Sequence, residues 1–253
     1  MRFVRTPFVW MILLAAGLMF GVTTLLKAQD LVIDLSDPIV AITTGFAGTD
    51  VLLFGVAQKE GDLVVVVRGP QHNQIIRRKE RTWGIWINSD EVEFTEIPTF
   101  YSIASSRPIE EFVSLTEADI HQIGADKLIF RPVAHQAPID DITQFSDALL
   151  RIKKQDELYT LNETKLVYLG NGLFKTEVHF PANVAVGTYG IDVYLFQEGE
   201  LVENQTTLLN VRKFGLEAGI FDFAHRHSLA YGVLAVLIAA LAGWLANAAF
   251  RKR

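Results

Sequence analysis

The chain has 253 residues, half of them apolar, with 29 acidic and 23 basic side chains and no cysteine. The lack of cysteine excludes disulfides, thiolate metal sites and c-type haem attachment, and in an exported protein it favours a bacterial periplasm. The acidic balance argues against nucleic acid as a partner.

Residues 1–28 are predicted to direct export. Arg2 and Arg5 precede an apolar run that reaches Leu26, followed by "KAQD". This layout is typical of a secretory signal peptide. The run is longer than usual and Leu26 stands where a small residue is preferred before a cleavage site, so an uncleaved N-terminal anchor is the alternative. Either interpretation sends the chain that follows across the membrane.

Residues 30–106 are predicted to form a first β-sandwich domain. The runs "DVLLFGVA" and "LVVVVRG" are apolar on both faces, which predicts central strands covered on two sides. "NQIIRRKE", "TWGIWIN", "EVEFTEI" and "FYSIASS" follow as further strands, with Trp83, Ile85 and Ile87 alternating along the second of them. Many short strands at this spacing indicate an immunoglobulin-like sandwich.

One dense basic cluster lies in this segment, beside Trp83 and Trp86. Its members are Arg77, Arg78, Lys79 and Arg81. One interpretation is a contact for an acidic partner or a small anion. The other is an edge hairpin whose basic side chains prevent strand-to-strand aggregation.

Residues 107–212 are predicted to form a second β-rich domain that contains helices. Thr116 and Gly124 are suitable as the cap and the end of a short helix. The apolar residues in "DDITQFSDALLRIKKQDELY" recur at helical spacing, which indicates a packing stripe. Asn171-Gly172 is a strong hairpin signal, and two further strands surround the turn "QEGE".

Residues 213–228 are predicted to form a juxtamembrane segment. Phe214, Ala218 and Phe221 share one face of a helix, so a short helix lying in the membrane interface is one possibility. A helix packed on its own domain is the other.

Residues 229–250 are predicted to be a transmembrane helix. These 22 residues carry no charge, and a helix of this length spans roughly 33 Å, enough to cross the hydrocarbon core. The bases of the tail, 251–253, place the C-terminus in the cytoplasm and the preceding domains in the periplasm of an inner-membrane protein. Without the six bases at or near the ends, 17 lysines and arginines remain against 29 acids, a net charge of −12.

The transmembrane segment also offers a packing face. Four residues spaced by four share one side of the helix: Ala235, Ala239, Gly243 and Asn247. Small side chains allow a second helix to approach closely, and Asn247 can hydrogen-bond across the contact. Self-association or an integral membrane partner would use this face, whereas the alternative is simply an alanine-rich span.

Motifs for chemistry are absent from the sequence. It contains no G-x-S-x-G elbow, no H-E-x-x-H and no Walker-type loop. The six histidines are scattered over separate predicted elements, and His225 and His227 would point in nearly opposite directions on a helix. We therefore expect no enzyme activity, no catalytic residues, no metal site and no cofactor.

Seven segments along the chain resemble the alphaproteobacterial putative transmembrane protein family. They are "LSDPIVAITTGFAGTDVLLFG", "VVVVRGP", "RRK", "GIWIN", "FYSIASSRP", "LFKTEVHFPANVAVGTYGIDVYLF" and "FDFAHRHSLAYG". The resemblance implies membrane anchoring, no assigned activity and a link to permeases of the sulfite-exporter type. The expected function is that of a periplasm-facing accessory protein of a membrane complex. A tethered binding module for a small anion or other periplasmic ligand is the alternative.

Overall fold

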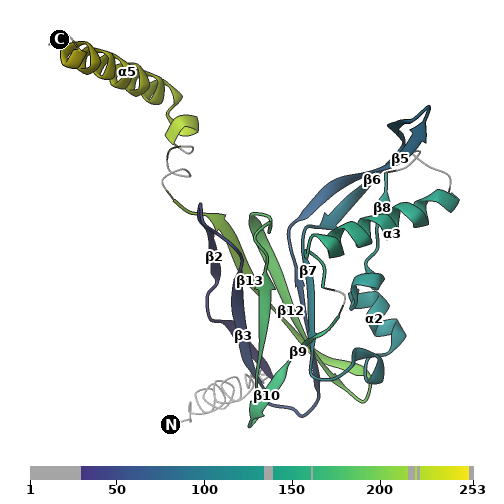
Figure 1. The fold of residues 1–253 in the computed structure, drawn as a ribbon. Helices are drawn as coiled ribbons and strands as arrows, with labels where there is room; N and C mark the ends of the chain where they lie inside the picture. The colour runs from purple at the N-terminus through teal and green to yellow at the C-terminus, as the bar shows by residue number, and fades with distance from the viewer. Residues whose placement is uncertain (1–29, 134–138, 161, 216–219, 221–222, 251–253) are drawn as a thin grey trace, which may run out of the picture. The chain divides into compact units, whose positions relative to one another are not determined.

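The computed structural model describes residues 30–133, 139–160, 162–215, 220 and 223–250. The predicted export segment and the basic tail lie outside these residues, as does part of the predicted juxtamembrane helix. From Leu31 onward the chain forms one unit. It is mainly β with some helix and ends in one apolar helix, α5 (Ser228–Phe250), which confirms the predicted class of a mainly β chain with a C-terminal apolar helix (Figure 1).

A four-stranded antiparallel sheet has the strand order β1–β3–β11–β10. Its strands are β1 (Leu31–Leu35), β3 (Thr49–Ala57), β11 (Leu173–Phe180) and β10 (Val167–Gly170). Asn171 and Gly172 join β10 to β11 with φ angles of 50° and 75°. Asn and Gly tolerate this left-handed conformation best, and the predicted hairpin is confirmed.

A six-stranded sheet has the order β2–β13–β12–β4–β7–β9. Its strands are β2 (Ile39–Ile42), β13 (Glu200–Lys213), β12 (Gly187–Gln197), β4 (Asp62–Arg68), β7 (Tyr101–Ser105) and β9 (Thr164–Lys165). The turn between β12 and β13 contains Glu198 and Gly199, both at positive φ, as the "QEGE" signal predicted.

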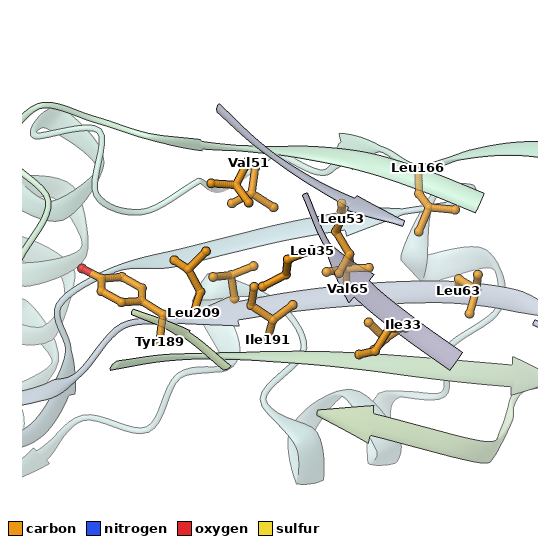
Figure 2. Close-up of a cluster of buried hydrophobic side chains, with 14 of the residues drawn as sticks. Ile33, Leu35, Val51, Leu53, Leu63, Val65, Leu166, Tyr189, Ile191 and Leu209 are labelled. Atoms are coloured by element: carbon orange, nitrogen blue, oxygen red, sulfur yellow. The ribbon is translucent and has the colours of Figure 1, made fainter. Parts of the chain in front are cut away.

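The main hydrophobic core lies between these two sheets. Figure 2 shows side chains from both sheets within it, among them Leu53 of β3, Val65 of β4 and Ile191 of β12. Leu53, Val65 and Ile191 are fully buried. Alternate residues of each strand supply this layer because successive side chains of a strand point to opposite faces.

The two segments expected to form separate sandwiches contribute to one sandwich. β3, from segment 30–106, pairs with β11, from segment 107–212, along the register from Leu173↔Val56 to Phe180↔Thr49. β4 likewise pairs with β12. The prediction of a sandwich boundary near residue 107 is therefore wrong. Strands of the two segments lie side by side in both sheets, and residues of both segments fill one shared core.

The six-stranded sheet is covered on its second face as well. η1 (Ile109–Glu111), α2 (Leu115–His121) and η2 (Ala125–Lys127) pack there against β4, β7 and β12. β4 is accordingly buried along both faces, as predicted, whereas β3 alternates between buried and exposed residues. α2 begins two residues earlier than expected, because the Ser114 hydroxyl rather than Thr116 caps it by accepting from the Glu117 amide.

A long hairpin carries the third sheet. It consists of β5 (Gln71–Thr82), β6 (Ile85–Pro98) and the short β8 (Arg131–Pro132), and α3 (Ile139–Gln155) packs against it (Figure 1). Phe145 and Leu149 of α3 meet Val92, Phe94 and Ile97 of β6 in a separate small core, which confirms the predicted packing stripe. The expected strand "TWGIWIN" is interrupted, because Trp83 and Gly84 form the turn of the hairpin.

Candidate functional site

The predicted basic cluster lies on β5, midway along the hairpin. The Arg77 Nε donates to Glu91 Oε2 at 2.9 Å, and the Arg78 Nη1 donates to Asp90 Oδ2 at 3.3 Å. Both partners stand on β6, so cross-strand ion pairs neutralise part of the cluster. Exposed pairs of this kind contribute little to stability.

α3 supplies the second wall of a groove beside this cluster. The Arg78 Nη2 donates to Gln144 Oε1 at 3.1 Å, and its guanidinium lies 5.0 Å from the centre of the Phe145 ring. The groove has a volume of about 350 Å³. It is lined by Ile76, Arg77, Arg78, Lys79, Gln144, Phe145, Ala148 and Arg151. We call this feature the basic groove.

Arg151 joins three members of the predicted cluster in the basic groove, and sequence reasoning missed it. Gln144, Ala148 and Arg151 share one face of α3, so their helical spacing was the available signal. Arg81 lies outside the groove, paired with Trp86 nearer the turn. Four cations around one hollow could hold a carboxylate, phosphate or sulfate group.

A second hollow, of about 340 Å³, lies between the hairpin base and α2. Arg68 lines it, donating to Asp192 Oδ2 at 2.6 Å and to the carbonyl oxygens of His121 and Gln122 at 2.5 and 3.3 Å. The Tyr101 hydroxyl also donates to the Gln122 oxygen at 3.0 Å. These contacts fasten the end of α2 to the six-stranded sheet, so Arg68 has a structural use here.

A tyrosine near this hollow, Tyr101, has a raised pKa, and burial is the main cause. It raises the pKa of Tyr101 to about 12, and the amide of Gly124, which donates to the hydroxyl at 2.8 Å, opposes the shift. Tyr101 is therefore neutral at physiological pH and acts as a fixed donor and acceptor.

The outer face of the four-stranded sheet carries exposed apolar side chains. Val32, Val56 and Leu173 are direct partners across β1, β3 and β11, and all three are exposed. Phe54 lies on the same face two residues from Val56 and is exposed too. We call Val32, Phe54, Val56 and Leu173 the apolar row. Contiguous apolar surface of this kind is typical of a protein contact.

Two of the described histidines each lie beside a single carboxylate. His179 Nδ1 lies 2.6 Å from Asp50 Oδ1, and His121 Nε2 lies 3.3 Å from Glu117 Oε2. No group of three potential metal ligands occurs among the described residues. His135 falls outside them.

All four residues of the predicted packing face lie on α5 and are exposed: Ala235, Ala239, Gly243 and Asn247. A segment of this helix, Ser228–Ala248, is long and apolar enough to cross a membrane, and none of its most apolar window is buried within the described part of the protein. Use of this face in helix packing stays a prediction.

The part of the chain from β1 to β13 we call the β unit. A comparison with known families gives one description that covers both the β unit and α5. The family described as "Putative transmembrane protein (Alph_Pro_TM)" matches residues 30–252. A search of curated proteins finds no match. The family match spans the β unit and α5 together and confirms the resemblance found in the sequence. The chain belongs to this family of putative transmembrane proteins.

Proposed function

We propose that the protein is a membrane-anchored accessory protein of a membrane complex, with its β unit in the periplasm. The apolar row is the observation that carries this proposal. A folded sheet face that presents four exposed apolar side chains in one patch gains free energy when another protein covers it. α5 restricts the search for that partner to proteins at the same membrane.

The proposed orientation rests on charge. Three basic residues follow α5 directly in the sequence, and the positive-inside rule keeps such a tail in the cytoplasm. The residues before α5 then face the periplasm. The resemblance to the family adds the finer proposal that the complex includes an anion permease of the sulfite-exporter type.

Affinity purification from gently solubilised membranes tests the accessory role. We expect the wild type to retain an integral membrane protein, and Val32→Glu together with Val56→Glu to lose it, because two carboxylates in the apolar row would be desolvated at the contact. Val202→Glu on β13 is the matched control, since Val202 and Val56 are both 38% exposed. Equal recovery by all three proteins would refute the role of the row.

Packing within the membrane has its own test. Gly243→Leu places a bulky side chain on the proposed face of α5, where space is open among the described residues. We expect normal insertion and weaker cross-linking to the partner or to a second copy. Leu241→Ala, away from that face, serves as the control. Unchanged cross-linking by Gly243→Leu would show that α5 acts only as an anchor.

The basic groove favours a second candidate function, a tethered module that binds a small anion. Arg77→Glu with Arg78→Glu should abolish binding of sulfate or a small dicarboxylate measured by calorimetry. Because these arginines pair with Glu91 and Asp90, the four-residue swap that adds Glu91→Arg and Asp90→Arg restores the cross-strand attraction. Binding that returns with the swap would indicate a fold defect, whereas binding that stays lost would support the groove.

A further inference from the structure

The tip of the hairpin exposes an unusual amount of apolar surface. A two-residue turn, Trp83-Gly84, connects Thr82 of β5 to Ile85 of β6. Trp83 is 98% exposed, Ile85 68% and Trp86 66%, and Ile87 is exposed as well. We call Trp83, Ile85, Trp86 and Ile87 the apolar tip. Large exposed apolar groups gathered at one point mark a contact with another phase or molecule.

Backbone geometry shows that the tryptophan is not there for the turn. Trp83 and Gly84 have φ angles of 55° and 84°, the left-handed pair that a type I′ hairpin turn requires. Asn, Asp or Gly suits the first position, whereas a bulky residue there is strained. Since Trp83 is almost wholly exposed, packing within the protein does not offset this strain. The side chain therefore serves a contact outside the described fold.

The apolar tip is apolar on both faces of the hairpin. Trp86 is the direct partner of Arg81, so these two side chains share one face. Ile85 and Ile87 alternate with Trp86 and lie on the opposite face, and Trp83 occupies the end. A protein partner with a flat surface would cover one face. A fluid apolar medium that surrounds the tip removes the apolar side chains of both faces from water.

Charged groups lie immediately behind the tip, with Lys79 and Arg81 on the Trp86 face of the hairpin and Glu80, the direct partner of Ile87, on the opposite face. Arg81 and Lys79 stand two and four residues before Trp83, which places them roughly 7 and 13 Å back along the strand at about 3.3 Å per residue. Segments that lie in a membrane interface bury their apolar side chains to about 5–10 Å. Long basic side chains can extend to the lipid phosphates at that depth, and tryptophan favours the same region.

We propose that the apolar tip inserts into the surface of an anionic phospholipid bilayer, the one that α5 spans. The anchor holds the hairpin close to that bilayer and gives it a high effective concentration there. Lys79 and Arg81 pair with anionic headgroups, while the acidic remainder of the β unit is repelled from them. This proposal is independent of the accessory role and needs only that α5 is in the membrane.

Tryptophan fluorescence of the full chain in nanodiscs tests the insertion. The sequence has four tryptophans, so Trp10→Phe with Trp244→Phe leaves Trp83 and Trp86 as the reporters. In nanodiscs of anionic lipid with brominated acyl chains, we expect a blue-shifted emission and the loss of most of its intensity relative to unbrominated lipid. Purified protein contains no partner, so the result does not depend on the proposed accessory function.

Two further arms make the test specific. Lys79→Gln with Arg81→Gln should reduce quenching in anionic lipid to the level seen in zwitterionic lipid, whereas Lys165→Gln with Arg212→Gln, on the six-stranded sheet, should not. Reporters that emit as in water and remain unquenched in every nanodisc would overturn the proposal. Quenching only by brominated vesicles added from outside would overturn it too, since the contact would then be with another membrane.

Discussion

At the scale of single residues, the buried Lys153 near the end of α3 is a measurable cost to the fold. Only 4% of its surface is exposed, and burial lowers the pKa of its ammonium group. The unfolded chain therefore binds this proton more tightly, and stability gains from this group as the pH rises toward the unfolded value of 10.5. Its Nζ lies 5.7 Å from the Tyr159 ring centre, which offsets part of the cost.

Lys153→Met should accordingly raise the free energy of unfolding at pH 7 by about 1 kcal/mol, since the methionine keeps the packed stem and removes the desolvated charge. Urea unfolding of the β unit in mild detergent measures this, and the advantage should shrink as the pH approaches 10.5. Lys154→Met, at an exposed position beside it, should change stability by less than about 0.5 kcal/mol. A destabilised Lys153→Met protein would show that the charge itself is needed.

At Trp83, a substitution should increase the stability of the fold and remove the proposed membrane contact. Trp83→Asn places a residue that favours the left-handed conformation at the first turn position, so the unfolding free energy should rise by about 1 kcal/mol. Thermal unfolding in detergent, without lipid bilayer, measures the gain. Trp86→Asn, in the strand itself, should give none. A loss of stability in Trp83→Asn would mean that the indole packs within the protein.

Two hairpin turns, Asn171-Gly172 and Trp83-Gly84, show that a turn is predictable from the sequence when both of its residues favour positive φ. Asn171-Gly172 was recognised because both residues favour positive φ. Trp83-Gly84 has the same geometry, but a tryptophan gives no turn signal, and the segment was predicted as one strand. The basic cluster was found because its members are neighbours in sequence. Arg151 was missed because tertiary packing of α3 brings it to them.

At the scale of elements, the hairpin and α3 depend on a core of their own. Leu149 is fully buried there, and Leu149→Ala should cost about 2–5 kcal/mol through the lost transfer energy and the cavity. Because this core is separate from the one between the sheets, hydrogen exchange should accelerate first in β5 and β6 and leave β12 protected. Ile152→Ala, at a more exposed position on α3, is the control. Uniform acceleration would show that the hairpin and the sandwich unfold as one.

Strands were predicted well from the sequence and their partners were not. The β-branched runs identify β3 and β4 by composition alone, because such residues suit a pleated surface. Nothing local indicates that β3 pairs with β11 or β4 with β12, since pairing depends on which faces are left uncovered after both segments fold. The uninterrupted valines of β4 correctly predicted that both of its faces are buried. The exposed residues of β3 are apolar as well, so composition could not show that one face of β3 is exposed.

At the scale of the whole molecule, tyrosines in both sheets make the stability of the fold depend on pH in the alkaline range. Burial raises the pKa of Tyr101, Tyr168 and Tyr189 to about 12. Their folded pKa values lie above the ordinary tyrosine pKa of 10.0, so the stability that they contribute is complete below pH 10 and is lost as the pH rises toward 12. Lys153 acts in the opposite direction, but its gain ends near 10.5.

The melting temperature of the β unit should therefore stay constant up to about pH 10 and fall steeply above that pH. The cause is ionisation of the buried tyrosine hydroxyls, which lie in both sheets. Thermal unfolding across pH 8–12 measures this. Tyr101→Phe removes hydrogen bonds to Gln122 and Gly124 and should cost about 1–3 kcal/mol at pH 7. Its loss between pH 10 and 12 should nevertheless be shallower than that of the wild type, because one titrating group is gone. Parallel alkaline curves for the two proteins would contradict the assignment, since a purely structural hydroxyl lowers stability equally at every pH.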